Sequence, residues 1–263
     1  MTREENVELQ EFYEKHFERG DRIPAIPKND DFMYALVIRE LRSYLRPNSD
    51  VLDLGCNTGN LSLFMALHGC NVLGIDIARN AIETARKSAK SYQIHNVRFE
   101  AVDFVSERVA FDAFDFILCS HVVEHVPRDD LFLRKLFVSA KSGGTLLLIT
   151  PTIYSSYYLL NKHLKGYVAH DQEVGHLRRY SRTGICSALE AAGFDIKKVV
   201  YLDSILRDWF ILDKKLRRFN SVWGLPLVRK AFNSCDSLLG NLFLFPSAIC
   251  VHAQKRADSG HDV

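Results

Sequence analysis

The fold of this chain is decided by residues 51–59, which read Val51-Leu52-Asp53-Leu54-Gly55-Cys56-Asn57-Thr58-Gly59. The apolar start predicts a buried strand, and the glycines after it permit a tight turn at which the backbone can approach a ligand closely. In an open α/β sheet, ligands gather at the carboxyl ends of the strands, where this loop would lie. The spacing departs from the G-x-G-x-x-G pattern of dinucleotide-binding proteins, because Asn57 stands at the second glycine position and no glycine stands at the third. A nicotinamide-dependent oxidoreductase is therefore disfavoured.

Alternating strand and helix patterns continue downstream of this loop. We expect seven strands, at residues 51–54, 71–76, 97–102, 114–120 and 145–150, from Phe194 onward, and at 248–254. Two of the helices between them present apolar faces, formed by Ala81, Ile82, Ala85 and Ala89 and by Leu133, Leu136, Phe137 and Ala140. Ser181 and Gly193 are placed to begin and end a third helix. This order predicts an α/β fold with a Rossmann-like, doubly wound sheet of seven strands.

The remaining segments are arranged around this sheet domain. Residues 1–46 read as an N-terminal helical cover that is broken at Pro24 and Pro27. The sheet domain takes residues 47–203 and 245–256, and residues 204–244 form a helical insertion before the last strand. This insertion is expected to be either a lid or a membrane-facing segment. Residues 257–263 are expected to be a disordered tail.

Composition narrows the class of protein. With 263 residues, 47% of them hydrophobic and 25% charged, the chain is typical of a globular protein and not of a disordered or fibrous one. Its formal net charge of +2 is too balanced for sequence-blind binding to nucleic acid. The six cysteines include no Cys-x-x-Cys pair, so we expect reduced thiols and no zinc site. No leader-like segment and no run of about 18 apolar residues occurs, so we expect a cytoplasmic protein that is at most peripheral to the membrane.

A carboxylate ends the second expected strand, in Gly74-Ile75-Asp76. It lies about 20 residues beyond the glycine loop, where an acidic side chain can accept hydrogen bonds from both hydroxyls of a ribose. Asp76 is therefore a candidate ribose ligand. The alternative for a lone aspartate at a strand end is the N-cap of the following helix.

Four ordered motifs follow one another at regular spacing. They read D-L-G-C-N-T-G from Asp53, G-I-D-I from Gly74, A-V-D-F from Ala101 and F-D-F-I-L-C-S-H-V-V-E-H-V from Phe114. This set resembles the motifs of class I S-adenosylmethionine-dependent methyltransferases, and in particular the small-molecule type of the ubiquinone-pathway O-methyltransferases. The resemblance is close over residues 51–151 and looser as far as Tyr201. It implies the Rossmann-like fold, S-adenosylmethionine as the cofactor and activity as a methyltransferase.

The resemblance also implies roles for individual residues around the cofactor. The methionine part would be surrounded by Asp53, Gly55, Cys56 and Gly59, with Ser120 lining the same side. The nucleoside would be held by Asp76 at the ribose and by Ile77, Asp103 and Phe104 around the adenine. In that arrangement Asp103 accepts from the adenine amino group, and Phe104 offers its backbone N–H to the ring.

Histidines are the candidates for catalysis on the methyl acceptor. His125 follows the fourth expected strand, and His176, near His170, follows the fifth. A neutral imidazole suits a general base near pH 7, whereas the alternative is a histidine that only bonds to backbone and fixes a loop. His121, Glu124 and His125 would share a face if this segment is helical, an arrangement that could hold a divalent metal. The run resembles the Glu-x-x-Glu-His of metal-dependent ubiquinone-pathway and small-RNA 3′-terminal ribose methyltransferases, with His121 in place of the first glutamate.

The composition of the insertion at residues 204–244 indicates which kind of methyl acceptor to expect. Residues 205–234 carry seven Lys and Arg against two Asp, beginning with Arg207, and Trp, Phe and Leu are interleaved with these charges. Such a stretch either lies in a membrane interface or packs as a helical lid with a solvated basic rim. We therefore expect O-methylation of a small acceptor that is hydrophobic or lipid-linked, with a membrane surface as a further partner. A nucleic-acid acceptor is disfavoured, because it would need a wider basic track with stacking aromatic side chains.

Two other functions remain open from the residues alone. One is metal-assisted methylation of a terminal RNA ribose, for which His121, Glu124, His125 and His176 would supply the ligands. The other is a regulatory protein that binds S-adenosylmethionine and methylates nothing. The pattern predicts no oligomeric state.

Overall fold

The structure of the protein is a computed structural model that describes residues 14, 23–106, 112–155, 171, 174–204, 206–207, 226–242 and 245–256. Several predictions concern residues outside these ranges. They concern His170, the tail at 257–263, nearly all of residues 1–22, and residues 208–225 of the insertion.

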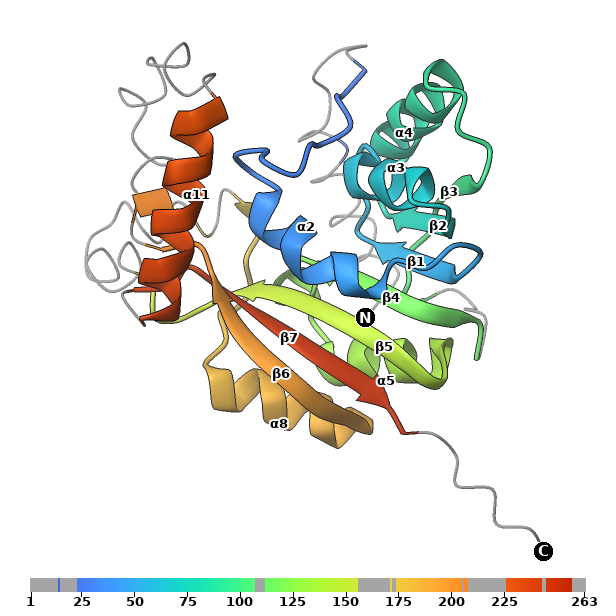
Figure 1. Cartoon of the computed structure of the whole chain (residues 1–263). Helices are drawn as coiled ribbons and strands as arrows, with labels where there is room; N and C mark the ends of the chain where they lie inside the picture. The colour runs from blue at the N-terminus through green and yellow to red at the C-terminus, as the bar shows by residue number, and fades with distance from the viewer. Residues whose placement is uncertain are drawn as a thin grey trace, which may run out of the picture.

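A seven-stranded sheet in the order β3-β2-β1-β4-β5-β7-β6 forms the centre of the fold (Figure 1). Its strands are β1 (Asp50–Leu54), β2 (Asn71–Asp76), β3 (Val97–Ala101), β4 (Phe114–Ser120), β5 (Ala140–Pro151), β6 (Phe194–Leu202) and β7 (Ala248–Lys255). Neighbours among β1 to β5 are parallel, whereas β7 is antiparallel to both β5 and β6. The carboxyl ends of β1 to β6 therefore lie at one edge of the sheet. The predicted Rossmann-like, doubly wound sheet is confirmed.

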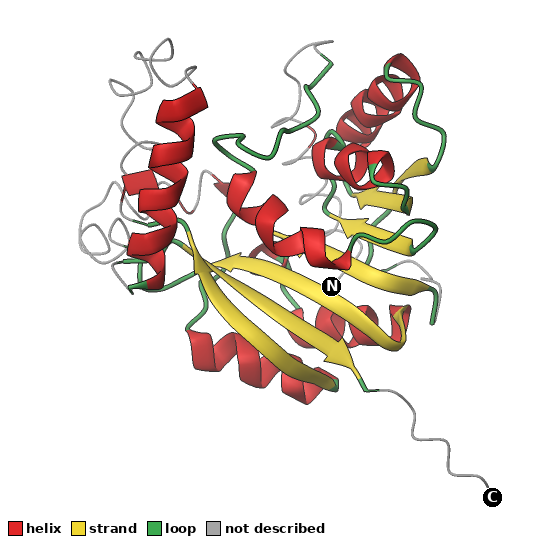
Figure 2. Cartoon of the chain, in the orientation of Figure 1, coloured by secondary structure: helices red, strands yellow, loops and turns green. Residues whose placement is uncertain are grey.

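Helices cover both faces of this sheet (Figure 2). One face carries α2 (Ala35–Leu41), the 3-10 helix η1 (Arg42–Tyr44), α3 (Asn60–Leu67) and α4 (Arg79–Ser91), and the other carries α5 (Asp129–Ser139) and α8 (Arg182–Ala192). Each face has a core of its own, built on Ile38, Leu63 and Ile82 in the first case and on Phe132, Leu136 and Leu189 in the second. Two layers of helices thus bury strands whose residues are apolar on both sides.

The ends of α8 illustrate how local sequence sets an element. The Ser181 hydroxyl accepts a hydrogen bond from the backbone N–H of Gly184 at 3.0 Å, which satisfies one of the unpaired donors of the first turn. Gly193 ends the helix at φ 111°, a left-handed conformation that a side chain would disfavour. Both predicted ends of this helix are confirmed.

Two local predictions are wrong. Ala140 does not belong to a helical face, because α5 ends at Ser139 and Ala140 begins β5, fully buried beside Phe114. The helical spacing of apolar residues does not show where a helix ends when a strand begins at the next residue. Arg207 does not belong to a solvated rim, because it is 1% exposed and its guanidinium is paired with Asp203 and Asp236. Those two carboxylates offset the cost of removing the guanidinium charge from water.

The segments outside the sheet are only partly described. Residues 23–34 contain no regular helix, in keeping with Pro24 and Pro27, and lead into α2. Within the insertion, α11 (Pro226–Asn241) stands beside β6 (Figure 1). Among the residues that the structure describes, no helix combines the length and the apolar character needed to cross a membrane.

Candidate functional site

The glycine loop between β1 and α3 is tied to the neighbouring strand β2. The backbone N–H groups of Gly55 and Cys56 both donate to the Ile75 carbonyl oxygen, at 2.8 and 3.0 Å. Gly55 has φ 73°, and a Cβ there would lie 2.2 Å from a methyl carbon of Val122. The loop therefore requires glycine at this position both for its backbone conformation and for space.

Asp76 connects this loop to the start of α4. Its Oδ2 accepts from the backbone N–H of Asn57 at 2.8 Å, and its Oδ1 accepts from that of Ala78 at 3.0 Å. Burial raises the pKa of Asp76 above its ordinary value, and the backbone hydrogen bonds oppose that shift. The N-cap position of α4 is Ala78, two residues further on, so Asp76 does not stand at the cap itself.

A cavity of about 390 Å³ opens beside these residues, at the carboxyl edge of the sheet. That volume lies within the range of pockets for small molecules and cofactors. Six of the residues predicted around the cofactor line it, together with both candidate catalytic histidines: Gly55, Asp76, Ile77, Asp103, Phe104, Ser120, His125 and His176. The loops after β1, β2, β3 and β4 thus converge on one space.

Three residues predicted around the methionine part do not line this cavity. Asp53 is 3% exposed and accepts a hydrogen bond from the Ser62 hydroxyl. Burial raises the pKa of Asp53 to about 7, and the charge of Asp76 acts in the same direction. Burial also raises the pKa of the Cys56 thiol, which therefore stays protonated. Gly59 precedes α3 at φ 84°, where a Cβ would lie 2.8 Å from the Phe99 ring.

Asp103 presents an unused acceptor at the cavity. Its Oδ1 accepts from the backbone N–H of Val105 at 2.9 Å, whereas its buried Oδ2 has no hydrogen-bond partner in the described part of the chain. A buried carboxylate oxygen without a donor is costly, so a ligand that brings an N–H would relieve it. An adenine amino group is such a donor, and the neighbouring Phe104, 5% exposed, supplies apolar surface for the ring.

His125 and His176 lie against each other, with ring centroids 4.9 Å apart. The Nδ1 atom of His125 lies 3.0 Å from the Gly175 carbonyl oxygen. Because a carbonyl oxygen can only accept, Nδ1 carries the hydrogen, and Nε2 carries the lone pair of the neutral ring. Burial lowers the pKa of His125 below its ordinary value, so the ring is neutral near pH 7.

His176 is anchored in the same way by a residue that the sequence did not single out. Its Nδ1 lies 2.9 Å from Oδ1 of Asp171, which also accepts from Arg179 at 2.8 Å. A carboxylate that holds Nδ1–H again leaves Nε2 as the basic nitrogen. Asp171 and His176 are five residues apart, with no regular period to mark the pair, so sequence reasoning had no signal for it.

Glu124 lies between these rings and the sheet. It is fully buried, and its carboxylate contacts His121 Nδ1 and the Thr150 hydroxyl, each at 3.2 Å. Burial acts to raise the pKa of Glu124, but the hydrogen bond and charge of His121 outweigh it and hold the pKa below its ordinary value. An ionised carboxylate is therefore buried beside two imidazoles, of which His125 places Nε2 at 4.0 Å from its Oε1.

The structure brings together three of the four residues predicted as metal ligands and leaves out His121. Ligand atoms of Glu124, His125 and His176 all lie within 4.8 Å of one another. His121 contacts Glu124 but is outside this group, because the segment forms only a short 3-10 helix, η2 (Val123–His125), and His121 precedes it at φ 56°. The group suits a divalent cation, since two lone-pair nitrogens and one carboxylate are the ligands such ions accept.

Comparisons with known proteins place this geometry in a family. A family model described as a methyltransferase domain matches residues 30–199. A ubiquinone biosynthesis O-methyltransferase of Coxiella burnetii is 30% identical over 118 residues, which are 45% of this chain and 46% of that protein. The chain spans about half the length of the curated relatives it matches.

Solved structures share the fold at low identity. A SAM-dependent methyltransferase from Archaeoglobus fulgidus matches with a TM-score of 0.57 at 19% identity, covering 92% of this chain and 98% of that chain. Phosphoethanolamine N-methyltransferase 2 of Haemonchus contortus, in complex with S-adenosyl-L-methionine, reaches a TM-score of 0.63 at 16% identity, covering 95% of this chain and 57% of that chain. At these identities the likeness concerns the fold alone.

Proposed function

This chain belongs to the methyltransferase domain family, as a class I S-adenosylmethionine-dependent member, and from that premise we propose that it methylates an oxygen atom of a small hydrophobic or lipid-linked acceptor. The observation that carries the proposal is the pair of imidazoles at the cavity, His125 and His176, each anchored through Nδ1. A neutral base at this place suits an acceptor hydroxyl, which must lose its proton on methylation. The Coxiella burnetii relative is named as an O-methyltransferase.

The donor site in this proposal uses the residues that line the cavity. Asp76 accepts from the ribose hydroxyls, Ile77 and Phe104 enclose the adenine, and Asp103 accepts from its amino group through the unused Oδ2. Ser120 and Gly55 line the side toward the methionine part. The roles predicted for Asp53, Cys56 and Gly59 stay predictions, and these residues would act by shaping the loop from behind.

The chemistry asked of the protein is mainly alignment. S-adenosylmethionine, when bound, supplies the methyl group and also the leaving group, which is its positively charged sulfur. The residues that line the cavity would hold the acceptor oxygen in line with the methyl group. In the transfer that the bound donor would supply, the carbon–sulfur bond would break as the oxygen–carbon bond forms, and its electron pair would stay on sulfur. Nε2 of His176 or His125 takes the hydroxyl proton, and Asp171 stabilises the charge that results on His176.

A second candidate is metal-assisted methylation, and the grouping of Glu124, His125 and His176 favours it. A divalent cation held there would polarise an acceptor hydroxyl, as in the methylation of a terminal RNA ribose. The two candidates exclude each other, because an imidazole nitrogen that binds a cation cannot also take a proton.

One experiment separates these functions. The protein is incubated with methyl-labelled S-adenosylmethionine and either an isoprenoid-substituted phenol or a short RNA, with and without a chelator. Label in the phenol that survives the chelator supports the base mechanism, and label that the chelator abolishes supports the metal. Label in RNA alone contradicts the proposed acceptor class. Tight cofactor binding without methyl transfer to either substrate or to fractionated extract would indicate a regulatory protein.

A further inference from the structure

The helix α11 has an apolar outer face and a polar inner face, the reverse of an ordinary surface helix. Leu227, Leu238 and Leu242, the last directly after the helix, are 82%, 60% and 62% exposed. Ala231 and Cys235 are exposed between them. Spacings of three and four residues place all five on one stripe, which we call the outer stripe.

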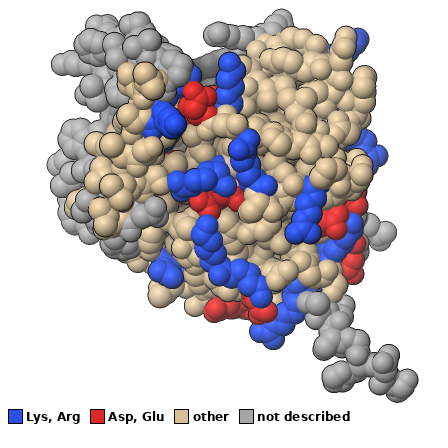
Figure 3. Space-filling model, viewed as in Figure 1, with Lys and Arg blue, Asp and Glu red and all other residues tan. Residues whose placement is uncertain are grey.

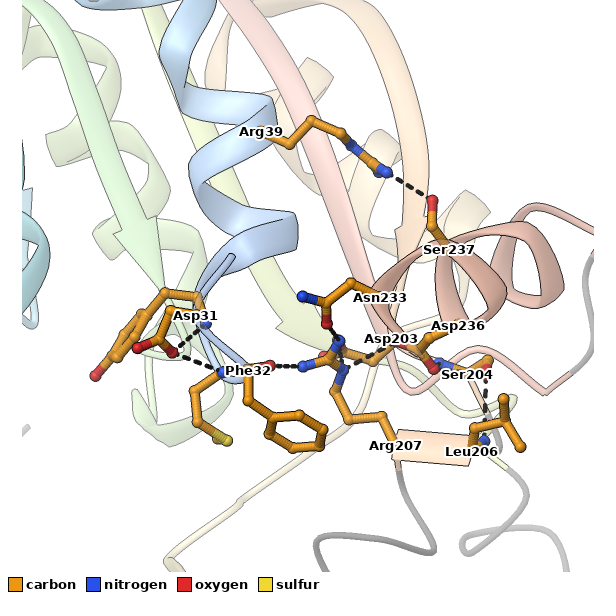
Figure 4. Close-up of polar contacts among 12 residues, drawn as sticks. Asp31, Phe32, Arg39, Asp203, Ser204, Leu206, Arg207, Asn233, Asp236 and Ser237 are labelled. Atoms are coloured by element: carbon orange, nitrogen blue, oxygen red, sulfur yellow. Dashed lines mark hydrogen bonds and ion pairs between the residues drawn. The ribbon is translucent and has the colours of Figure 1, made fainter. Parts of the chain in front are cut away.

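The inner face of α11 carries two buried polar side chains, Asn233 and Asp236 (Figure 4), and Phe232 beside them packs on the Phe32 ring. Asp236, 0% exposed, accepts from Arg207 Nε at 2.9 Å and from the Ser204 hydroxyl at 2.6 Å. Asn233, 8% exposed, accepts from Arg207 Nη2 at 2.9 Å, and Arg207 donates in addition to the Phe32 carbonyl oxygen. Because these hydrogen bonds need the polar side chains to face Arg207, they fix the rotation of α11 about its axis and turn its leucines outward.

The helix stands at the edge of the sheet where the cavity opens. Gly240 packs on the end of β6, where a Cβ would make an ordinary van der Waals contact with the Asp203 carbonyl oxygen at 3.5 Å. β6 runs in the same direction as β4 and β5, so its carboxyl end shares an edge with the end of β4. Ser120 and His125 reach the cavity from that end of β4. The outer stripe and the cavity thus belong to one end of the molecule.

The exposed charge on α11 itself is cationic. Asp236 is the one acidic residue of α11 and is buried, whereas Lys230 is exposed. Arg39 of α2, whose side chain is 44% exposed, donates to the Ser237 hydroxyl at 2.6 Å and so lies beside the helix, where it also pairs with the buried Glu40 at 3.0 Å. Lys and Arg side chains are spread over the face of the molecule that carries α11, with Asp and Glu side chains beside several of them (Figure 3).

We propose that the outer stripe of α11 docks on an anionic lipid bilayer, with its leucines at the boundary between the headgroups and the acyl chains. Helices that lie in this boundary combine an apolar face with neighbouring cations. The inference deepens the proposed function, because docking brings the cavity edge to a lipid-linked acceptor. The test of docking needs neither methyl donor nor acceptor, so the docking proposal and the proposed function can fail separately.

A second copy of the chain fits the outer stripe less well. A specific protein interface takes about 20–30 residues on each side. The stripe offers five side chains, two of which are the small Ala231 and Cys235. A bilayer needs no complementary shape, and its attraction grows with the apolar area and with the anionic charge.

The first test is sedimentation with vesicles of phosphatidylglycerol and phosphatidylcholine in equal parts. The protein should bind these vesicles, and salt should weaken the binding. Leu238→Ser combined with Leu242→Ser should lower partitioning by about tenfold or more, since two apolar side chains are lost. Leu67→Ser is the matched control, because Leu67 lies on α3 and is also 60% exposed. It should bind as the unchanged protein does.

Cys235 supplies a second readout from the stripe itself. It is the exposed cysteine of the chain, whereas Cys186 is half-buried and the other four are buried. A nitrobenzoxadiazole group attached to Cys235 should shift its emission to the blue when vesicles are added and should become shielded from aqueous iodide. Iodide should still quench it in the Leu238→Ser, Leu242→Ser variant.

Three results would overturn the proposal. The first is a folded protein that ignores anionic vesicles, and the second is an equal loss of binding in the Leu67→Ser control. The third is a dimer that the stripe substitutions dissociate while vesicles remain unbound, which would make the stripe an interface between copies. Vesicle binding without methyl transfer to a lipid-linked acceptor would support docking and contradict the proposed acceptor.

Discussion

The carboxylate of Asp171 holds His176 by its Nδ1 atom at 2.9 Å, and the ring of His176 lies 4.9 Å from that of His125. The loop that carries His176 also bonds to the segment after β4, since the backbone N–H of Leu177 donates to the Glu124 carbonyl oxygen at 2.9 Å. The orientation of the candidate base is therefore set by residues that do not line the cavity.

Replacing Asp171→Asn should lower kcat by roughly 10- to 100-fold, because the charge that orients His176 is lost. The affinity for S-adenosylmethionine should not change, since Asp171 does not line the cavity. Asp195→Asn, which removes a surface carboxylate paired with Arg256, is the matched control and should leave both quantities unchanged. A weaker donor affinity with an unchanged kcat would assign Asp171 to the donor site instead.

The pH profile of kcat/KM should reflect the low pKa of His125. A base acts only when neutral, and burial lowers the pKa of this ring below its ordinary value of 6.5. If His125 is the base, activity should therefore persist below pH 6.5 and decline only at more acidic values. Replacing His125→Gln should abolish this acidic limb and lower kcat by about 10²- to 10⁴-fold. An unaltered limb in the variant would assign the base to His176.

Asp103 should discriminate between purine rings. S-inosylhomocysteine presents a carbonyl oxygen where S-adenosylhomocysteine presents an amino group, and it would face the Asp103 carboxylate. The adenine compound should therefore bind about tenfold more tightly or better. Asp103→Asn should narrow this ratio, because an amide can donate to the carbonyl. Equal affinities in the unchanged protein, measured by competition, would remove Asp103 from the adenine site.

Asp53 should make stability depend on pH. Its pKa is about 7 in the folded chain against 3.8 as the ordinary value, so the folded state retains a proton that the unfolded state releases. The stabilisation is complete below about pH 4 and is lost as the pH rises through 7. In Asp53→Asn the free energy of unfolding should exceed that of the unchanged protein at pH 8, by on the order of 1–4 kcal/mol, and approach it at pH 4. The free energies of unfolding come from urea denaturation. If the difference between Asp53→Asn and the unchanged protein is the same at all pH values, the assignment is contradicted.

The sheet could be predicted from the sequence because its strands are buried and apolar. β2 (Asn71–Asp76) and β4 (Phe114–Ser120) begin and end at the predicted residues. The glycine loop and Asp76 could be paired in advance, since loops at the carboxyl ends of neighbouring parallel strands meet at one edge. The adjacency of Gly55 and Ile75 in the structure is a direct consequence of this register.

Other features left no pattern in the sequence. Asp171 is one of two acids, with Glu173, in a connecting segment, and its role depends on its tertiary contact with His176. Arg207 stands in a basic run, yet its partners Asp236 and Phe32 lie 29 and 175 residues away along the chain. Only tertiary packing brings such groups together, so neither the buried arginine nor the outward leucines of α11 could be inferred from local periodicity.

Titration calorimetry with S-adenosylhomocysteine, the demethylated product of the donor, tests the central claim most directly. The folded protein should bind one molecule per chain with saturable heat. Asp76→Ala should weaken the affinity by about 1–3 kcal/mol through the loss of the ribose hydrogen bonds. Absence of heat with both this compound and S-adenosylmethionine, on protein shown to be folded by circular dichroism, would contradict the account.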